Sequence, residues 1–134
     1  MIVVDPNIVA YLHLAGAHTT AAQAAFGRDP AWVAPPLWRE EFVNILAQQC
    51  RLAGLSTVAA LEILAHASAL MTPRETAIEA EAALRLAVAE KISGYDAHYL
   101  ALARKLRLPL LTEDRELLKK FPSEALSLAV FTAA

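Results

Sequence analysis

The chain has 134 residues, which is enough to bury one hydrophobic core and too few for two domains of ordinary size. Although 57% of the residues are hydrophobic, charged residues, His or Pro interrupt every apolar stretch before the roughly 20 residues that a membrane-spanning helix needs. The single cysteine excludes an internal disulfide and a cysteine-based zinc cluster, and the net charge of −2 lacks the basic excess typical of nucleic-acid-binding proteins. We expect one domain over residues 1–134, without membrane contact and, because no signal peptide is visible, located in the cytoplasm.

Predicted strands and helices alternate along the chain. Apolar segments of β type occur at residues 2–4, 32–34, 108–111 and 128–131, and residues 69–72 offer one more. Helices are predicted at residues 37–53, 56–67, 75–92, 95–107 and 113–121. Because parallel strands need crossover connections, this order predicts an α/β fold, a three-layer α/β/α sandwich with a mostly parallel central sheet.

The first predicted strand runs directly into Asp5, an acidic residue that a buried strand should avoid. Asp followed by Pro is a common helix start, because the carboxylate caps free backbone N–H groups and proline suits the first helical position. The same place is also the carboxyl end of a parallel strand, where such sheets bind ligands. The residues alone leave both interpretations open.

A second acidic position lies in APPLWREEFVNIL, a helix that begins after two prolines and carries Glu40 and Glu41. At about 100° per residue, Glu41 lies roughly 110° and Glu40 roughly 150° from the centre of the apolar face. Glu41 is therefore nearer the border of the core, by a margin too small to choose between them. A solvated helix face explains the two residues equally well.

Two further aspartates follow near the end of the chain. Asp96 lies in the first turn of the predicted helix GYDAHYLALA, and Asp114 follows the strand LPLLT. Taken singly, each is compatible with helix capping, but the topology places Asp5 and Asp114 at the same sheet edge. Carboxylates gathered in a poorly solvated cleft repel one another unless a cation offsets them. Oxygen-only ligation suits Mg²⁺ or Mn²⁺, which also bind substrate phosphates, so the pattern indicates phosphodiester chemistry.

Three segments together resemble the PIN domain family, and within it the VapC-type toxin ribonucleases of bacterial toxin–antitoxin systems. They are IVVDPNIVAYL, APPLWREEFVNIL and YDAHYLALARKLRLPLLTEDRELLKKFP, in the family's order and close to its spacing, so the likeness extends over nearly the whole chain. The family has Glu three residues before an Asn, here Asn44, which favours Glu41 over Glu40. The resemblance implies an acidic quartet of catalytic and metal-binding residues: Asp5, Glu41, Asp96 and Asp114. It also implies that Asn7 and Thr112 are supporting polar side chains.

The resemblance further implies a metal-dependent endoribonuclease that cleaves RNA phosphodiester bonds with Mg²⁺ or Mn²⁺ as cofactor. A toxin of the VapBC type would form a homodimer and bind a small VapB-like antitoxin protein. The chain departs from the family at Pro6, where a small residue is common, and at Glu116, where some members have Asp. Residues 54–90 carry no family motif.

Two alternatives from other classes remain. A catalytically silent protein of the same fold would only bind a partner, although the presence of all four acids argues against it. A phosphatase or phospho-acceptor domain also has an Asp after its first strand, but DPN is not the DxD that such phosphatases favour. The histidines lack metal-site spacing, and the aromatic residues, Tyr95 and Tyr99 among them, are predicted to pack in the core rather than to stack on bases.

Overall fold

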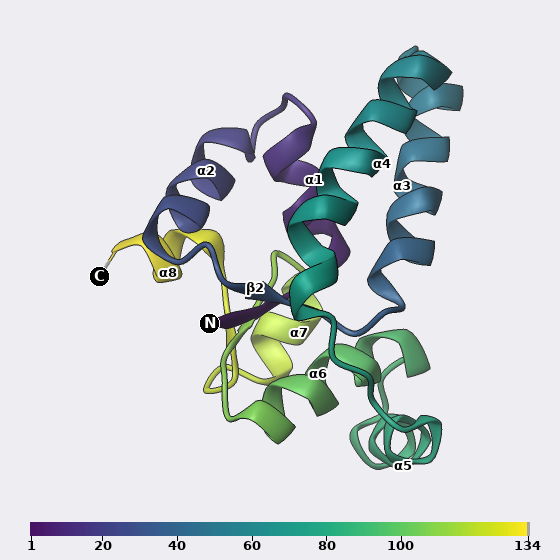
Figure 1. Ribbon diagram of the computed structural model, residues 1–134. Coiled ribbons are helices and arrows are strands. Elements are labelled where there is room, and N and C mark those ends of the chain that lie inside the picture. The colour runs from purple at the N-terminus through teal and green to yellow at the C-terminus, as the bar shows by residue number, and fades with distance from the viewer. Residues whose placement is uncertain (134) are drawn as a thin grey trace.

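A four-stranded parallel sheet forms the centre of the computed structural model, which describes residues 1–133 (Figure 1). The strand order is β2-β1-β3-β4, with every neighbouring pair parallel. The four strands are β1 (Ile2–Val4), β2 (Trp32–Val33), β3 (Leu110–Leu111) and β4 (Ala125–Leu126). The predicted α/β class with a parallel sheet is therefore confirmed.

Helices surround this sheet and make up most of the chain. They are α1 (Pro6–His13), α2 (Thr19–Arg28), α3 (Trp38–Ala53), α4 (Thr57–Met71), the 3-10 turn η1 (Thr72–Arg74), α5 (Ala80–Glu90), α6 (Gly94–Leu106), α7 (Arg115–Lys120) and α8 (Leu128–Ala133). Helices α1 to α4 lie on one side of the sheet and α5 to α7 on the other, and α3 and α4 form a long projecting pair (Figure 1). No helix in the described range is long and apolar enough to cross a membrane.

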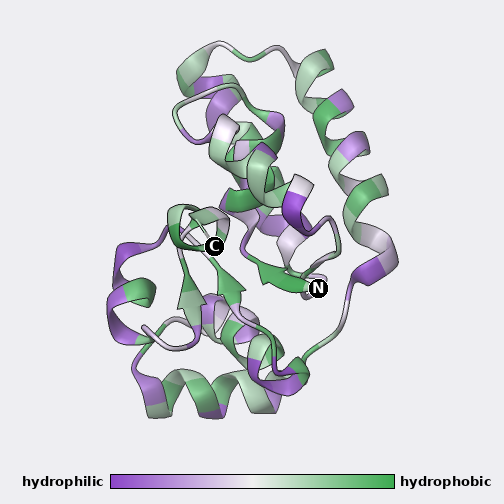
Figure 2. Ribbon diagram, turned by 90° about the vertical axis from the view of Figure 1, so that its left-hand side faces the viewer, coloured by the Kyte–Doolittle hydropathy of each residue, from purple (hydrophilic) through white to green (hydrophobic). Residues whose placement is uncertain are grey.

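The strands are hydrophobic on both faces, as central strands of parallel sheets are when helices cover both sides (Figure 2). All three residues of β1 are fully buried. Strand β1 pairs with β2 on one side and with β3 on the other, and Val4 lies opposite Leu111. This register sets the residues that follow β1 and β3 beside each other.

Two predicted strands are helical instead. Residues 69–72 complete α4 and enter η1, because Ala67 and Met71, four residues apart, face the core as one side of a helix. Residues 128–131 belong to α8, where the Ser127 hydroxyl accepts the Val130 N–H at 3.2 Å and Val130 is 58% exposed. The fourth strand lies a few residues earlier, at β4.

The helix predicted from residue 75 begins only at Ala80. Glu75 instead forms a parallel bridge with Ala34, and its carboxylate accepts hydrogen bonds from the Trp38 indole at 2.8 Å and the Arg39 guanidinium at 2.6 Å. These tertiary bonds hold the segment extended. The other predicted helices agree with α3, α4, α6 and α7 to within a few residues, and the segment between Asp5 and Trp32 forms α1 and α2.

Most of the aromatic residues predicted for the core are there, with one exception. Trp32, Trp38 and Phe42 are fully buried and Tyr99 nearly so, but Tyr95 is 62% exposed. Tyr95 is the second residue of α6, and later residues of that helix, such as Leu100, fill its buried face instead. The packing role predicted for Tyr95 is therefore wrong.

Candidate active site

Asp5 is the most buried acidic residue of the site and is only 9% exposed. One of its oxygens, Oδ1, accepts the backbone N–H of Ile8 at 3.2 Å and so caps α1. The other, Oδ2, accepts the hydroxyl of Thr112, which follows β3. The capping interpretation is thus correct, and it coexists with a position at the carboxyl edge of the sheet.

Thr112 connects Asp5 to the loop that carries Asp114. Its Oγ1 accepts the backbone N–H of Asp114 at 3.1 Å while its proton goes to Asp5. A hydroxyl has a single proton, so accepting from one neighbour leaves that proton for the other. Asp114 itself caps α7, since its Oδ1 accepts the Leu117 N–H at 3.0 Å.

Helix α6 contributes Asp96 from the opposite side of the sheet edge. Ser93 caps this helix, because its hydroxyl accepts the backbone N–H of Asp96 at 3.0 Å. The cap therefore does not depend on the Asp96 carboxylate. Helix α6 packs against β1 and β3, the two strands that precede Asp5 and Thr112. Asp96 is half-buried beside them.

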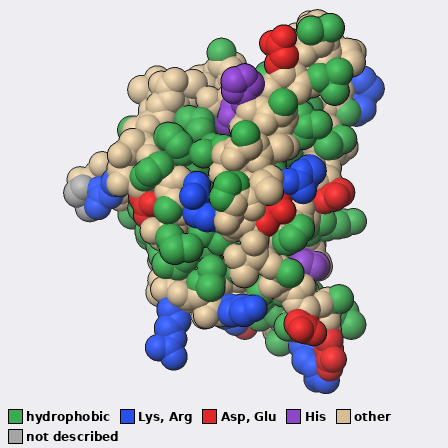
Figure 3. Space-filling view, viewed as in Figure 1, with side chains coloured by type: hydrophobic (Ala, Val, Ile, Leu, Met, Phe, Trp, Pro, Cys, Tyr) green, Lys and Arg blue, Asp and Glu red, His purple; other side chains and the backbone are tan. Residues whose placement is uncertain are grey.

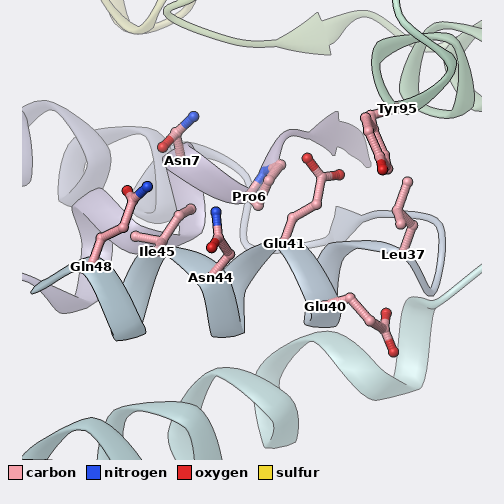
Figure 4. A pocket seen from close by; sticks show the side chains of 9 residues that line it. All are labelled: Pro6, Asn7, Leu37, Glu40, Glu41, Asn44, Ile45, Gln48 and Tyr95. Carbon is pink, nitrogen blue, oxygen red and sulfur yellow. The ribbon is translucent and has the colours of Figure 1, made fainter. Parts of the chain in front are cut away.

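Glu41 extends from α3 toward this region and is held by Tyr99. The Tyr99 hydroxyl donates to Glu41 Oε1 at 2.8 Å, which links α3 to α6. In Figure 4 the Glu41 carboxylate lies between Pro6 and Tyr95, whereas Glu40 turns toward α4. Tertiary packing therefore gives Glu40 and Glu41 different surroundings, a difference that helical periodicity was too coarse to predict. The role of Tyr99 was missed because a core tyrosine and a carboxylate-binding tyrosine look alike in sequence.

Burial and the charges of neighbouring carboxylates raise the pKa values of three of the four acids. Burial raises the pKa of Asp5 to about 6, against the hydrogen bonds from Thr112 and the backbone, and the charge of Asp96 adds to the rise. Burial and then the charge of Asp114 raise the pKa of Asp96. Burial also raises the pKa of Glu41, where the Tyr99 hydrogen bond opposes and Asp96 reinforces the rise. Asp96 is thus the neighbour of all three other acids.

Two hollows lie beside this group. A cavity of about 570 Å³, which we call the amide cavity, lies between α1, α3 and the start of α6 and includes Glu41. A smaller cavity of about 270 Å³, the lysine cavity, is lined by the acids Asp96, Asp114 and Glu116 together with Lys91 and Lys120. The first cavity has carboxylates and amides but no Lys or Arg among its lining residues, whereas the second has both acids and lysines. Elsewhere Lys and Arg side chains are separated on the face seen in Figure 3, with no continuous basic surface.

The donor set suits a hard divalent cation. Within residues 1–133, no group of three or more His, Cys, Asp or Glu side chains is arranged so that it could hold a metal ion. Mg²⁺ does not require such a group, since it commonly takes one or two carboxylates and completes its octahedron with waters and substrate phosphate oxygens. Buried carboxylates with raised pKa values are groups whose ionised form a cation would stabilise. The residues present therefore fit Mg²⁺ or Mn²⁺.

A model of the PIN domain family matches residues 2–122, which is most of the chain. The chain belongs to the PIN domain family. PIN domains are generally metal-dependent nucleases that act on RNA and typically bind divalent metals. The fold of this PIN domain is similar to the crystal structure of PAE2754 from Pyrobaculum aerophilum, with a TM-score of 0.74 and 24% identity over 99% of this chain and 97% of that one. No curated protein matches its sequence.

Thr112 offers a test of how this PIN domain supports Asp5. Thr112→Val removes the donor to Asp5 and the acceptor for Asp114, so we expect a loss of about 1 to 3 kcal/mol of stability and a tenfold to hundredfold weaker affinity for Mn²⁺. Urea unfolding and calorimetric Mn²⁺ titration measure these changes. Thr112→Ser keeps the hydroxyl and should stay close to the wild type in affinity. Equal metal affinity in the Val and Ser variants would show that the hydroxyl does not support the site.

Proposed function

We propose that this PIN domain is a Mg²⁺- or Mn²⁺-dependent endoribonuclease whose catalytic and metal-binding residues are Asp5, Glu41, Asp96 and Asp114. The observation that supports the proposal is that Asp96 connects these acids electrostatically, although they lie up to 109 positions apart in the chain: besides burial, its charge raises the pKa values of Asp5 and Glu41, and the charge of Asp114 raises its own. Uncompensated buried charges destabilise a fold, so a cation is the natural reason to keep them together.

Each residue has a role that its surroundings support. Asp5 and Asp96, the central pair, would hold the metal directly, and Asp114 would assist, partly through water. Glu41 would act as a further ligand or as the base that orients the attacking water, in the position that Tyr99 fixes. When bound, a metal ion of this kind acts as a Lewis acid and lowers the pKa of bound water. Thr112 favours the ionised form of Asp5, because its hydroxyl donates to that carboxylate.

The lysine cavity suits the RNA backbone. Lys91 and Lys120 line it together with the acids Asp96, Asp114 and Glu116, so a phosphate next to the scissile one could pair with the two lysines while a bound metal offsets the acids. The net charge of −2 is then compatible with an RNA substrate, because a bound metal and these lysines would supply positive charge locally.

We extend the proposal to a VapC-type toxin that forms a homodimer and is inhibited in the cytoplasm by a small VapB-like antitoxin. The support is the resemblance of the three sequence segments, together with an apolar hollow of about 200 Å³ between α3 and α4. Val43 and Leu61 line this hollow and are exposed, as residues of a protein–protein interface would be in the free chain. The silent-protein alternative predicts the same surface without cleavage, and the digestion below separates the two.

The test is digestion of total cellular RNA with and without Mn²⁺, followed by mapping of the cut ends. Glu41→Gln should lower the cleavage rate by at least about a hundredfold, since it removes a charge that acts on the reacting centre. Glu40→Gln changes the neighbouring acid, which turns toward α4, and should lower it less than tenfold. Undiminished cleavage in excess chelator, or equal losses in the two variants, would contradict the assignment.

A further inference from the structure

The amide cavity carries polar and aromatic groups that the proposed mechanism does not use. Asn7 of α1 and Asn44 and Gln48 of α3 line it, and Tyr95 stands at its far end beyond Glu41 (Figure 4). In the figure, Asn44 and Gln48 extend from the side of α3 that faces α1. All three amide side chains are exposed to solvent, so each has donors and acceptors available to a ligand.

The charge of this cavity excludes one part of a nucleotide and favours another. Among the described residues that line it are two carboxylates, Glu40 and Glu41, and no Lys or Arg. A phosphate placed there would meet like charge without a compensating cation, whereas a neutral base or ribose would meet amides that can both donate and accept. Lys91 and Lys120 lie in the other cavity, so the two hollows differ in the chemistry that they accept.

Tyr95 supplies an exposed aromatic ring at the same place. It is 62% exposed in the first turn of α6, and it directly precedes Asp96 in the chain. Its packing contribution is small at this exposure, while an exposed ring beside a polar cavity is the usual platform on which single-stranded nucleic acids stack their bases. Its position next to Asp96 would set a stacked base close to the scissile phosphate.

We propose that the amide cavity binds one unpaired nucleoside of the RNA substrate, with its base stacked on Tyr95 and its polar edge bonded to Asn44 and Gln48. The inference rests on the proposed function and deepens it, because it names the residues that would bind a nucleoside of the substrate. A base can reach the cavity only when it is free of a duplex, so the substrate is single-stranded RNA or a loop. The volume of about 570 Å³ lies in the range of small-ligand sites and accommodates a nucleoside.

Binding measured without cleavage tests the site independently of catalysis. In an Asp5→Asn background with Mn²⁺ present, fluorescence anisotropy should show that Tyr95→Ala weakens binding of a labelled single-stranded RNA oligonucleotide about tenfold, as loss of one stacked base does. Tyr95→Phe keeps the ring and should bind within about twofold of the background. Gln48→Ala should also weaken binding, while Gln23→Ala, an exposed amide on α2 outside the cavity, should not.

A fluorescence experiment reports on stacking directly. Trp32 and Trp38 are fully buried, so in Tyr95→Trp the introduced indole is the exposed one in the part of the chain that the structure describes. Single-stranded RNA should quench its emission, and a fully paired duplex of the same sequence should quench it far less. The unsubstituted protein, with the two buried tryptophans alone, is the control.

The two proposals fail in different ways. If Tyr95→Ala binds single-stranded RNA as the background does and the Tyr95→Trp emission is unaffected by it, the nucleoside site is overturned, whatever the nuclease activity. If RNA quenches that emission but the wild type cuts no RNA in Mn²⁺, the nucleoside site stands and the ribonuclease assignment falls. Equal binding of duplex and single strand would also overturn the nucleoside site.

Discussion

Asp5→Asn is expected to lower RNA cleavage by about a thousandfold or more. The carboxylate is the most buried of the acidic quartet and is held by Thr112 and by the N-terminus of α1, so no other acid can move into its place. Loss of a charged ligand removes several kcal/mol of transition-state stabilisation, and about 4 kcal/mol corresponds to a thousandfold in rate. Single-turnover cleavage of a defined RNA in Mn²⁺ measures the change.

The same variant should fold at least as stably as the wild type when metal is absent. An amide does not have to ionise in a buried place, and its oxygen can still accept the Ile8 N–H and keep the cap of α1. Urea unfolding in chelator at pH 7 provides the control. A variant that is inactive because it is unfolded would show that Asp5 acts in capping alone, and a stable variant with wild-type cleavage would remove Asp5 from the site.

The second large effect is a loss of metal-free stability as the pH rises from about 4 to above 6. Asp5 has a pKa of about 6 in the folded protein against an ordinary 3.8, so the unfolded chain releases this proton first and the folded chain keeps it longer. The stabilisation is fully present below pH 3.8, the pKa of Asp5 in the unfolded chain. It is lost as the pH rises through about 6, the pKa of Asp5 in the folded protein. The difference between the two values corresponds to about 3 kcal/mol.

Other groups modify the curve without reversing it. Burial raises the pKa values of Glu41 and Asp96 in the same direction, while ion pairs lower those of Asp29 and Glu124. The latter two are partly exposed to solvent, which screens their contributions. Asp5, Glu41 and Asp96 should therefore dominate the pH dependence.

Urea unfolding between pH 4.5 and 7.5 in chelator measures this curve, and Asp5→Asn should flatten it. Mn²⁺ at about a hundred times its Kd should restore about 2 to 3 kcal/mol at pH 7 and less at pH 5, where protons compete for the carboxylates. Stability that rises with pH over this range in chelator would contradict the raised pKa of Asp5. Equal stabilisation by Mn²⁺ at both values would show that the ion binds elsewhere.

Sequence reasoning succeeded where a local pattern has one physical cause. The apolar segment before Asp5 had to be a buried strand, and its alternation with helices required a parallel sheet. It failed where tertiary contacts overrode local preference. Residues 75–79 have helix-forming neighbours, yet the hydrogen bonds of Glu75 to Trp38 and Arg39 hold them extended. Residues 128–131 have strand-type side chains, but the sheet is already completed by β4 and Ser127 begins a helix there.

The sequence by itself determined the α/β class and the parallel sheet, because hydrophobic periodicity and residue order encode them directly. The candidate acidic quartet also needed the resemblance to the PIN domain family, which favoured Glu41 over Glu40. Only the tertiary structure shows how the surroundings of Glu40 and Glu41 differ, since both lie on the polar side of α3 and the hydroxyl that holds Glu41 comes from Tyr99, 58 residues away. It also moved Tyr95 from the core to the rim of the amide cavity. Such distinctions depend on which helix packs opposite, and no local pattern in the chain contains that information.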